Sequence, residues 1–166
     1  IHYLVDSVEK TKIITPDHLR EAFIKCAAAE TFVSWKYYKS KNNNGENTLD
    51  EQLKEGKIPP EFLRSMFYTY ADYRDIYLDK DISKKEGDVK KAKDKIDEIF
   101  PNIDGKTNDT KRKEFWKENG KEIWKGMICG LSHAGGADKE TLTKTYPYNN
   151  VKFSGGTNPP TLEEFA

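Results

Sequence analysis

The sequence has few of the residues that build metal sites and disulfide scaffolds. It contains 2 cysteines and 3 scattered histidines in 166 residues. Zinc sites need clustered cysteine and histidine, and small disulfide scaffolds need several cysteine pairs. The composition therefore excludes both classes. It leaves two alternatives open for Cys26 and Cys129, which are a pair of buried free thiols or one disulfide.

An excess of one charge and long apolar runs are also lacking. Lys and Arg total 28, as do Asp and Glu, so the formal net charge is +0. This balance excludes a strongly basic nucleic-acid binder and an acidic tail protein. No apolar run approaches the roughly 18 residues of a membrane-spanning helix, so we expect no direct membrane insertion by this chain. The mean hydropathy of -0.87 would suit a disordered chain, but an aromatic content of 12% favours a folded domain.

Helical periodicity is the main feature that is present. Apolar residues recur at three- and four-residue steps between proline and glycine breaks, which predicts four long helices near 16–40, 60–78, 88–100 and 110–131. Thr15 is the expected cap of the first helix and Asp88 that of the third. The predicted fold class is all-α, a helical bundle of about four long helices with large irregular loops. We expect one shared core that contains Trp35, Phe67, Tyr70, Trp124 and Met127.

The connections between these helices are expected to be long. The polar segment 47–56 is compatible with a short helix, whereas no helical period persists over 137–160, which predicts an irregular segment lying on the bundle. A formal glycosylation sequon begins at Asn108 and indicates only a surface position. Arg74 lies between two aspartates in the sequence and is expected to join a partly buried ion pair.

The end of the chain carries a helix start. Thr161 and Glu164 form a capping box. The sequence stops two residues after this signal and does not begin with Met, so we expect a piece of a longer protein, with any targeting signal outside it.

A search for catalytic chemistry finds no G-x-S-x-G elbow, glycine-rich phosphate loop or H-E-x-x-H motif. Ser132 and His133 are adjacent without a partner acid, and Cys129 stands at i,i+4 to His133 beside glycines that disfavour a catalytic geometry. Four aspartates imitate a calcium loop but lack the glycine and terminal glutamate of an EF-hand: Asp72, Asp75, Asp79 and Asp81. We expect no enzyme, no cofactor and no metal site.

The third predicted helix and the segment before it are rich in lysine. Two interpretations remain open, a solvated helix face or a docking patch for an acidic partner such as a sulfated glycan or an acidic protein surface. The candidate basic face consists of Lys84, Lys85, Lys90, Lys91, Lys93 and Lys95.

Six blocks follow one another along the sequence: AFIKCAAAETF at 22–32, IPPEFLRSMFYT at 58–69, DYRDI at 72–76, NDTKRKEFW at 108–116, IWKGMIC at 123–129 and TLEEFA at 161–166. In this order they resemble the Duffy-binding-like domain of the Plasmodium falciparum erythrocyte membrane protein family of variant surface antigens. The resemblance covers the middle of such a domain. It implies that residues 1–166 are a single partial domain, the central helical subdomain, with the N- and C-terminal parts absent.

The resemblance implies an exported adhesin on the surface of the infected erythrocyte, as part of a larger membrane-anchored protein. Its partners would be host endothelial or erythrocyte receptor proteins or sulfated glycosaminoglycans, and it implies no catalysis. Members of the family bind different receptors through variable positions, so no receptor-contact residue is carried over. An alternative is a non-adhesive helical spacer that positions binding surfaces elsewhere in the parent protein.

The resemblance also bears on the cysteines. Many members carry a cysteine where this sequence has Tyr77, so Cys26 and Cys129 are left as the possible intrachain pair. An exported module sits in an oxidising environment, where paired cysteines persist. We therefore predict a Cys26–Cys129 disulfide between the first and fourth long helices. A cytosolic enzyme, the third alternative, would keep both thiols free.

Overall fold

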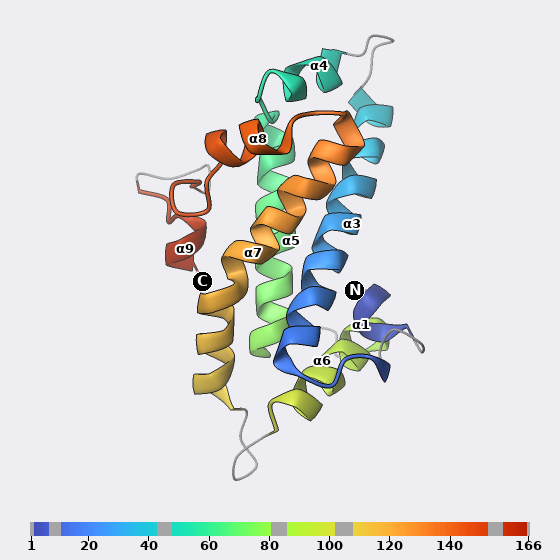
Figure 1. Cartoon of the computed structure of the whole chain (residues 1–166), viewed down its shortest axis with the longest axis vertical. Coiled ribbons are helices and arrows are strands. Elements are labelled where there is room, and N and C mark those ends of the chain that lie inside the picture. The colour runs from blue at the N-terminus through green and yellow to red at the C-terminus, as the bar shows by residue number, and fades with distance from the viewer. Residues whose placement is uncertain are drawn as a thin grey trace.

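The computed structural model describes residues 2–6, 11–42, 48–80, 86–101, 108–152 and 158–165, and its regular elements there are α-helices. The four predicted long helices are confirmed. They are α3 (Pro16–Asn42), α5 (Pro60–Leu78), α6 (Gly87–Ile99) and α7 (Asp109–Gly135). The first two and the last run along the long axis of the molecule, and α6 lies across its lower end (Figure 1).

Four short helices complete the described part: α1 (His2–Val5), α4 (Thr48–Lys54), α8 (Lys139–Thr145) and α9 (Leu162–Phe165). The helix expected in 47–56 is α4, which lies with α8 at the upper end of the bundle, whereas α9 lies beside the middle of α7 (Figure 1). None of the helices in the described ranges is long and apolar enough to cross a membrane.

The helix ends follow side-chain chemistry at most of the expected places. Thr15 Oγ1 accepts a hydrogen bond from the His18 amide at 3.2 Å, as predicted. The capping box is confirmed, because the Thr161 amide donates to Glu164 at 2.9 Å and the Glu164 amide donates to Thr161 Oγ1 at 3.1 Å. Asp88 is not the cap of α6, since that helix already begins at Gly87.

Two expectations about the second half of the chain are wrong. The segment 137–160 is not irregular throughout, because α8 forms within it. The Asp138 carboxylate caps α8 by accepting hydrogen bonds from the Thr141 hydroxyl (2.7 Å) and amide (2.9 Å), and these bonds lower the pKa of Asp138. Asn108 is not on the surface but is 7% exposed.

Glycines set the distance between α3 and α7. Helix α7 continues past the expected end near residue 131 and ends at Gly135. A Cβ atom on Gly130 would lie 2.1 Å from the carbonyl oxygen of Ala28, and one on Gly126 would lie 2.9 Å from the Ile24 side chain. The backbones of the two longest helices therefore touch, which only residues without a side chain permit.

The core is aromatic. The five residues expected there, Trp35, Phe67, Tyr70, Trp124 and Met127, are each at most 1% exposed and belong to one cluster. The Phe67 and Trp124 rings stack with centroids 5.9 Å apart and planes 10° apart, which joins α5 to α7. Such ring pairs add about 0.5–1.5 kcal/mol to the effect of burial.

Ion pairs attach α6 to the bundle. Arg112 of α7 is fully buried, forms an ion pair with Asp97 of α6, and donates to the Tyr77 carbonyl oxygen at 3.1 Å. One turn earlier on α6, Lys93 forms an ion pair with Asp79 at the end of α5. The position of α6 thus depends on paired charges as well as on its narrow apolar stripe.

Candidate binding site

The lysines predicted as a basic face do not share one open surface. Lys93 and Lys95 are each 7% exposed, so the prediction is wrong for these two residues. Lys93 pairs with Asp79, and Lys95 pairs with Glu98. Their aliphatic stems pack against the bundle while their ammonium groups meet carboxylates.

The other described members of this set are exposed but paired. Lys90 lies 3.0 Å from Asp94, and Lys91 lies 3.3 Å from Asp88. The predicted residues Lys84 and Lys85 lie outside the described residues. A carboxylate therefore neutralises each described lysine of α6 that we had selected, which reduces the charge available to a partner. A role of this helix in binding stays a prediction.

The predicted disulfide is not formed in the structure, where Cys26 and Cys129 are both free. The cause lies in the helical phase. Phe23 and Glu30 both contact Tyr73 of α5, and Cys26, at about 100° per residue, lies within about 60° of both on that side of α3. The side of α3 that contacts α7 instead carries Ile24. This residue is two positions from Cys26 in the sequence, which is a rotation of about 200° around the helix.

Among the described residues, the remaining sequence candidates are not assembled into a catalytic or metal site, and Asp81 lies outside those residues. The Ser132 hydroxyl donates to the Cys129 carbonyl oxygen at 2.8 Å, and His133 is exposed. Asp75 pairs with Arg74 at 3.2 Å, in the ion pair expected from the sequence, and Asp79 pairs with Lys93. Within the described ranges no group of three or more His, Cys, Asp or Glu could hold a metal ion.

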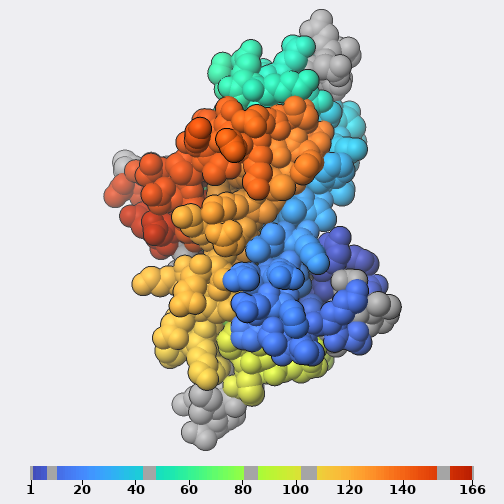
Figure 2. Space-filling model, viewed as in Figure 1, coloured from blue at the N-terminus to red at the C-terminus, as the bar shows by residue number. Residues whose placement is uncertain are grey.

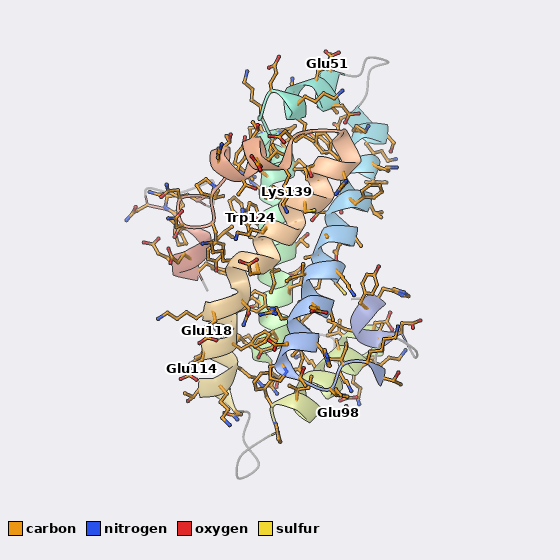
Figure 3. All side chains as sticks on the ribbon, viewed as in Figure 1. Glu51, Glu98, Glu114, Glu118, Trp124 and Lys139 are labelled. Atoms are coloured by element: carbon orange, nitrogen blue, oxygen red, sulfur yellow. The ribbon has the colours of Figure 1, made fainter. Side chains whose placement is uncertain are left out.

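The structure instead assembles cations around a pocket between α5 and α7, with a volume of about 220 Å³. We call this the α5–α7 pocket. Its lining contains four cationic side chains, one carboxylate and two apolar side chains. The cations are Arg74, Lys80, Lys113 and Lys117, the carboxylate is Glu114, and the apolar residues are Leu78 and Trp116. Side chains from the first half of α7 project from the left edge of the molecule in Figure 2, and Figure 3 labels Glu114 and Glu118 on this stretch.

Arg74 is the fixed cation of the α5–α7 pocket. Its side chain is only 13% exposed, its Nη1 atom donates to Asp75 at 3.2 Å, and its guanidinium carbon lies 4.4 Å from the centre of the Phe165 ring. Its Nε atom is buried and has no hydrogen-bond partner among the described residues. An unsatisfied buried donor costs about 1–3 kcal/mol, more when it is charged.

The lysines form the open rim of the pocket. Lys80, Lys113 and Lys117 are exposed, and no ion pair joins any of them to a carboxylate in the described part of the chain. Lys113 and Lys117 stand one turn apart, on the same face of α7. In contrast to the α6 lysines, their charges remain available to a ligand.

The floor of the pocket is rigid and neutral. The fully buried Trp116 donates through Nε1 to the Tyr70 hydroxyl at 3.1 Å, and Tyr70 in turn is 2.7 Å from the Tyr148 hydroxyl. Burial and then the nearby Tyr148 raise the pKa of Tyr70 well above its ordinary value, so this phenol carries no charge. Gly120 leaves the space for both hydroxyls, because a Cβ atom there would lie 2.5 Å from the Tyr70 oxygen.

A second pocket of about 230 Å³ lies between α7 and the segment after α8. Lys121 lines it, one turn beyond Lys117, so one row of lysines connects the two pockets along α7. Trp124, labelled in Figure 3, forms part of its wall and donates to the Tyr146 carbonyl oxygen at 3.0 Å. The sequence-based prediction missed this row, although the i,i+4 spacing of its lysines is a visible signal. Arg74 joins these lysines from another helix, α5, and no spacing pattern in the sequence indicates that it does so.

The family comparison covers almost the whole chain. A model of the Duffy binding domain matches residues 2–163. No curated protein and no solved structure matches the chain. The match agrees with the all-α fold and with the blocks of sequence that resemble such domains. The chain therefore belongs to the Duffy binding domain family, whose members are adhesion modules that bind receptors.

Proposed function

We propose that this chain binds a receptor on the surface of a host cell, as the central part of a larger exported adhesin. The observation that carries the proposal is the family match over residues 2–163. The sequence resemblance implies that the parent protein is displayed on the surface of the infected erythrocyte. Its partner there is a host receptor protein or a sulfated glycosaminoglycan.

The distribution of charge supports such a role. The chain as a whole is neutral, so it has no long-range attraction to an acidic surface. Three exposed lysines without an ion pair in the described part of the chain, Lys80, Lys113 and Lys117, surround the α5–α7 pocket together with Arg74. At physiological ionic strength screening acts over about 8 Å, so these charges act on a partner that is already in contact. This pattern suits selective contact recognition better than nonspecific adsorption.

The test is a binding screen of the folded chain against host endothelial cells, erythrocytes and immobilised sulfated glycosaminoglycans. Circular dichroism confirms that the sample is folded, and a heat-unfolded sample serves as the control for nonspecific adsorption. We expect saturable binding to at least one of these surfaces. Prior enzymatic removal of sulfated glycans from the cells separates a glycan receptor from a protein receptor.

The contradictory result has two parts. The folded chain binds none of these surfaces, and the parent domain binds one of them equally well before and after this part is removed. That outcome would support the spacer alternative, in which the bundle only positions binding surfaces elsewhere.

A further inference from the structure

We propose that the α5–α7 pocket binds a tetrahedral oxyanion, a sulfate or phosphate ester carried on a ring-sized group. The inference deepens the proposed function and rests on it for the source of the ester, which a host receptor would carry. The pocket itself is argued from its own residues.

The first argument is charge. Arg74, Lys80, Lys113 and Lys117 line the α5–α7 pocket, and Glu114 is the one carboxylate in its lining. Like charges held around one cavity repel one another, and an anion between them removes this repulsion. The selected lysines on α6 are different, because each described one already has a carboxylate partner.

The second argument is the fixed cation. Asp75 and Phe165 hold the guanidinium of Arg74 in place, and this side chain lines the pocket while only 13% of it is exposed. A guanidinium fixed in this way binds an anion without much further loss of side-chain freedom. The ion pair and the ring contact thus prepare Arg74 for an anion.

The third argument concerns the shape of the ligand. Arg74 of α5 and Lys80 just after it face Lys113 and Lys117 of α7, so the cations approach from different sides. Leu78 and Trp116 supply an apolar floor. An ester of sulfate or phosphate offers three terminal oxygens in different directions, whereas a planar carboxylate offers two. A volume of about 220 Å³ leaves room for part of the ring as well. The pocket accordingly favours a tetrahedral group attached to a ring.

The experiment follows amide, Arg Nε–H and indole resonances of the ¹⁵N-labelled chain by NMR at low salt. Glucose 6-sulfate and glucose 6-phosphate are the probes, and glucose is the neutral control. We expect both esters to shift the Arg74 Nε–H and Trp116 indole signals, and glucose to leave them unchanged. A stronger response to one ester identifies the preferred oxyanion.

Variants locate the site. Lys113→Gln with Lys117→Gln removes two exposed charges from the rim, and we expect the affinity to fall by about tenfold. The matched control, Lys90→Gln with Lys91→Gln, removes two exposed charges from α6 and is expected to change the affinity by less than about twofold. Arg74→Lys keeps the charge but removes the planar guanidinium, and it should weaken binding beyond the α6 control.

Three results would overturn the proposal. They are no shift with either ester, a neutral sugar that binds as well as the esters, or equal affinities of the rim variant and the α6 control. The cell-binding screen is a separate measurement. Ester binding without cell binding would refute the proposed function and leave the pocket standing, whereas cell binding without ester binding would refute the pocket alone.

Discussion

Replacing Gly130 with alanine tests the closest contact in the fold. The new methyl carbon would lie 2.1 Å from the carbonyl oxygen of Ala28, where 3.4–4 Å is an ordinary contact. The obstacle is backbone in the middle of α3, so no side chain can rotate away. The two helices must separate locally, and each of them has 27 residues.

Two opposing effects decide the magnitude. Overpacking of a well-packed core costs about 1–3 kcal/mol, and a backbone clash between two long helices belongs at the upper end of that range. Alanine in place of glycine inside a helix returns about 1 kcal/mol. We therefore expect Gly130→Ala to lower the free energy of unfolding by about 2 kcal/mol. For a chain of this size the melting temperature should fall by about 4–8 °C.

Thermal unfolding followed by circular dichroism at 222 nm measures this change. The control is Gly126→Ala on the same face of α7, where the Cβ atom would meet the Ile24 side chain at 2.9 Å and its carbonyl oxygen at 3.1 Å. A shift of a few tenths of an ångström relieves that contact. The free energy of unfolding of the Gly126→Ala variant should therefore stay within about 1 kcal/mol of that of the unmodified chain. A Gly130→Ala chain that melts at or above the unmodified one would refute the close packing of α3 and α7.

Further substitutions test the core, the buried charge, the cap and the thiols. Trp124→Ala should cost about 3–5 kcal/mol in urea unfolding, because this ring is 1% exposed, and an unchanged midpoint would contradict its place in the core. Arg112→Leu should cost about 2–3 kcal/mol, somewhat less than removal of one partner from a fully buried pair, since the Asp97 side chain is 47% exposed and the remaining carboxylate reaches water. The pKa of Asp138 is lowered from its ordinary value of 3.8, so its capping bonds stabilise α8 fully when the pH is above 3.8. This stabilisation is lost as the pH falls through the lowered pKa. Asp138→Asn keeps an acceptor that does not titrate, so the acid-induced loss of helical signal should shrink; an unchanged acid transition would argue against the cap. A thiol titration of the denatured, unreduced chain should find both Cys26 and Cys129 free, and the absence of titratable thiol would instead restore the disulfide.

The sequence by itself determined the helices and most of their ends. The apolar stripes, the two prolines at the start of α5, the Thr15 cap and the capping box at Thr161 all act within a few residues, so local chemistry is sufficient to predict them. It also determined which large residues are buried, because the aromatic side chains recur on the inner faces of periodic helices. Helix α8 was missed because Lys139–Thr145 is too short and polar to show a period.

Only the tertiary structure decided what the charged residues and the cysteines do. The lysines of α6 had the sequence pattern of an open face, yet Lys93 is buried against Asp79, which the turn after α5 brings to it. Cys26 and Cys129 stand on helices that do pack together, but the glycines of α7 fix the rotation of those helices and direct Cys26 toward α5. The α5–α7 pocket combines Arg74 with lysines far along the chain. Periodicity records which face of a helix is apolar, whereas the pairing of charges depends on which faces meet, and that is a property of the packed bundle alone.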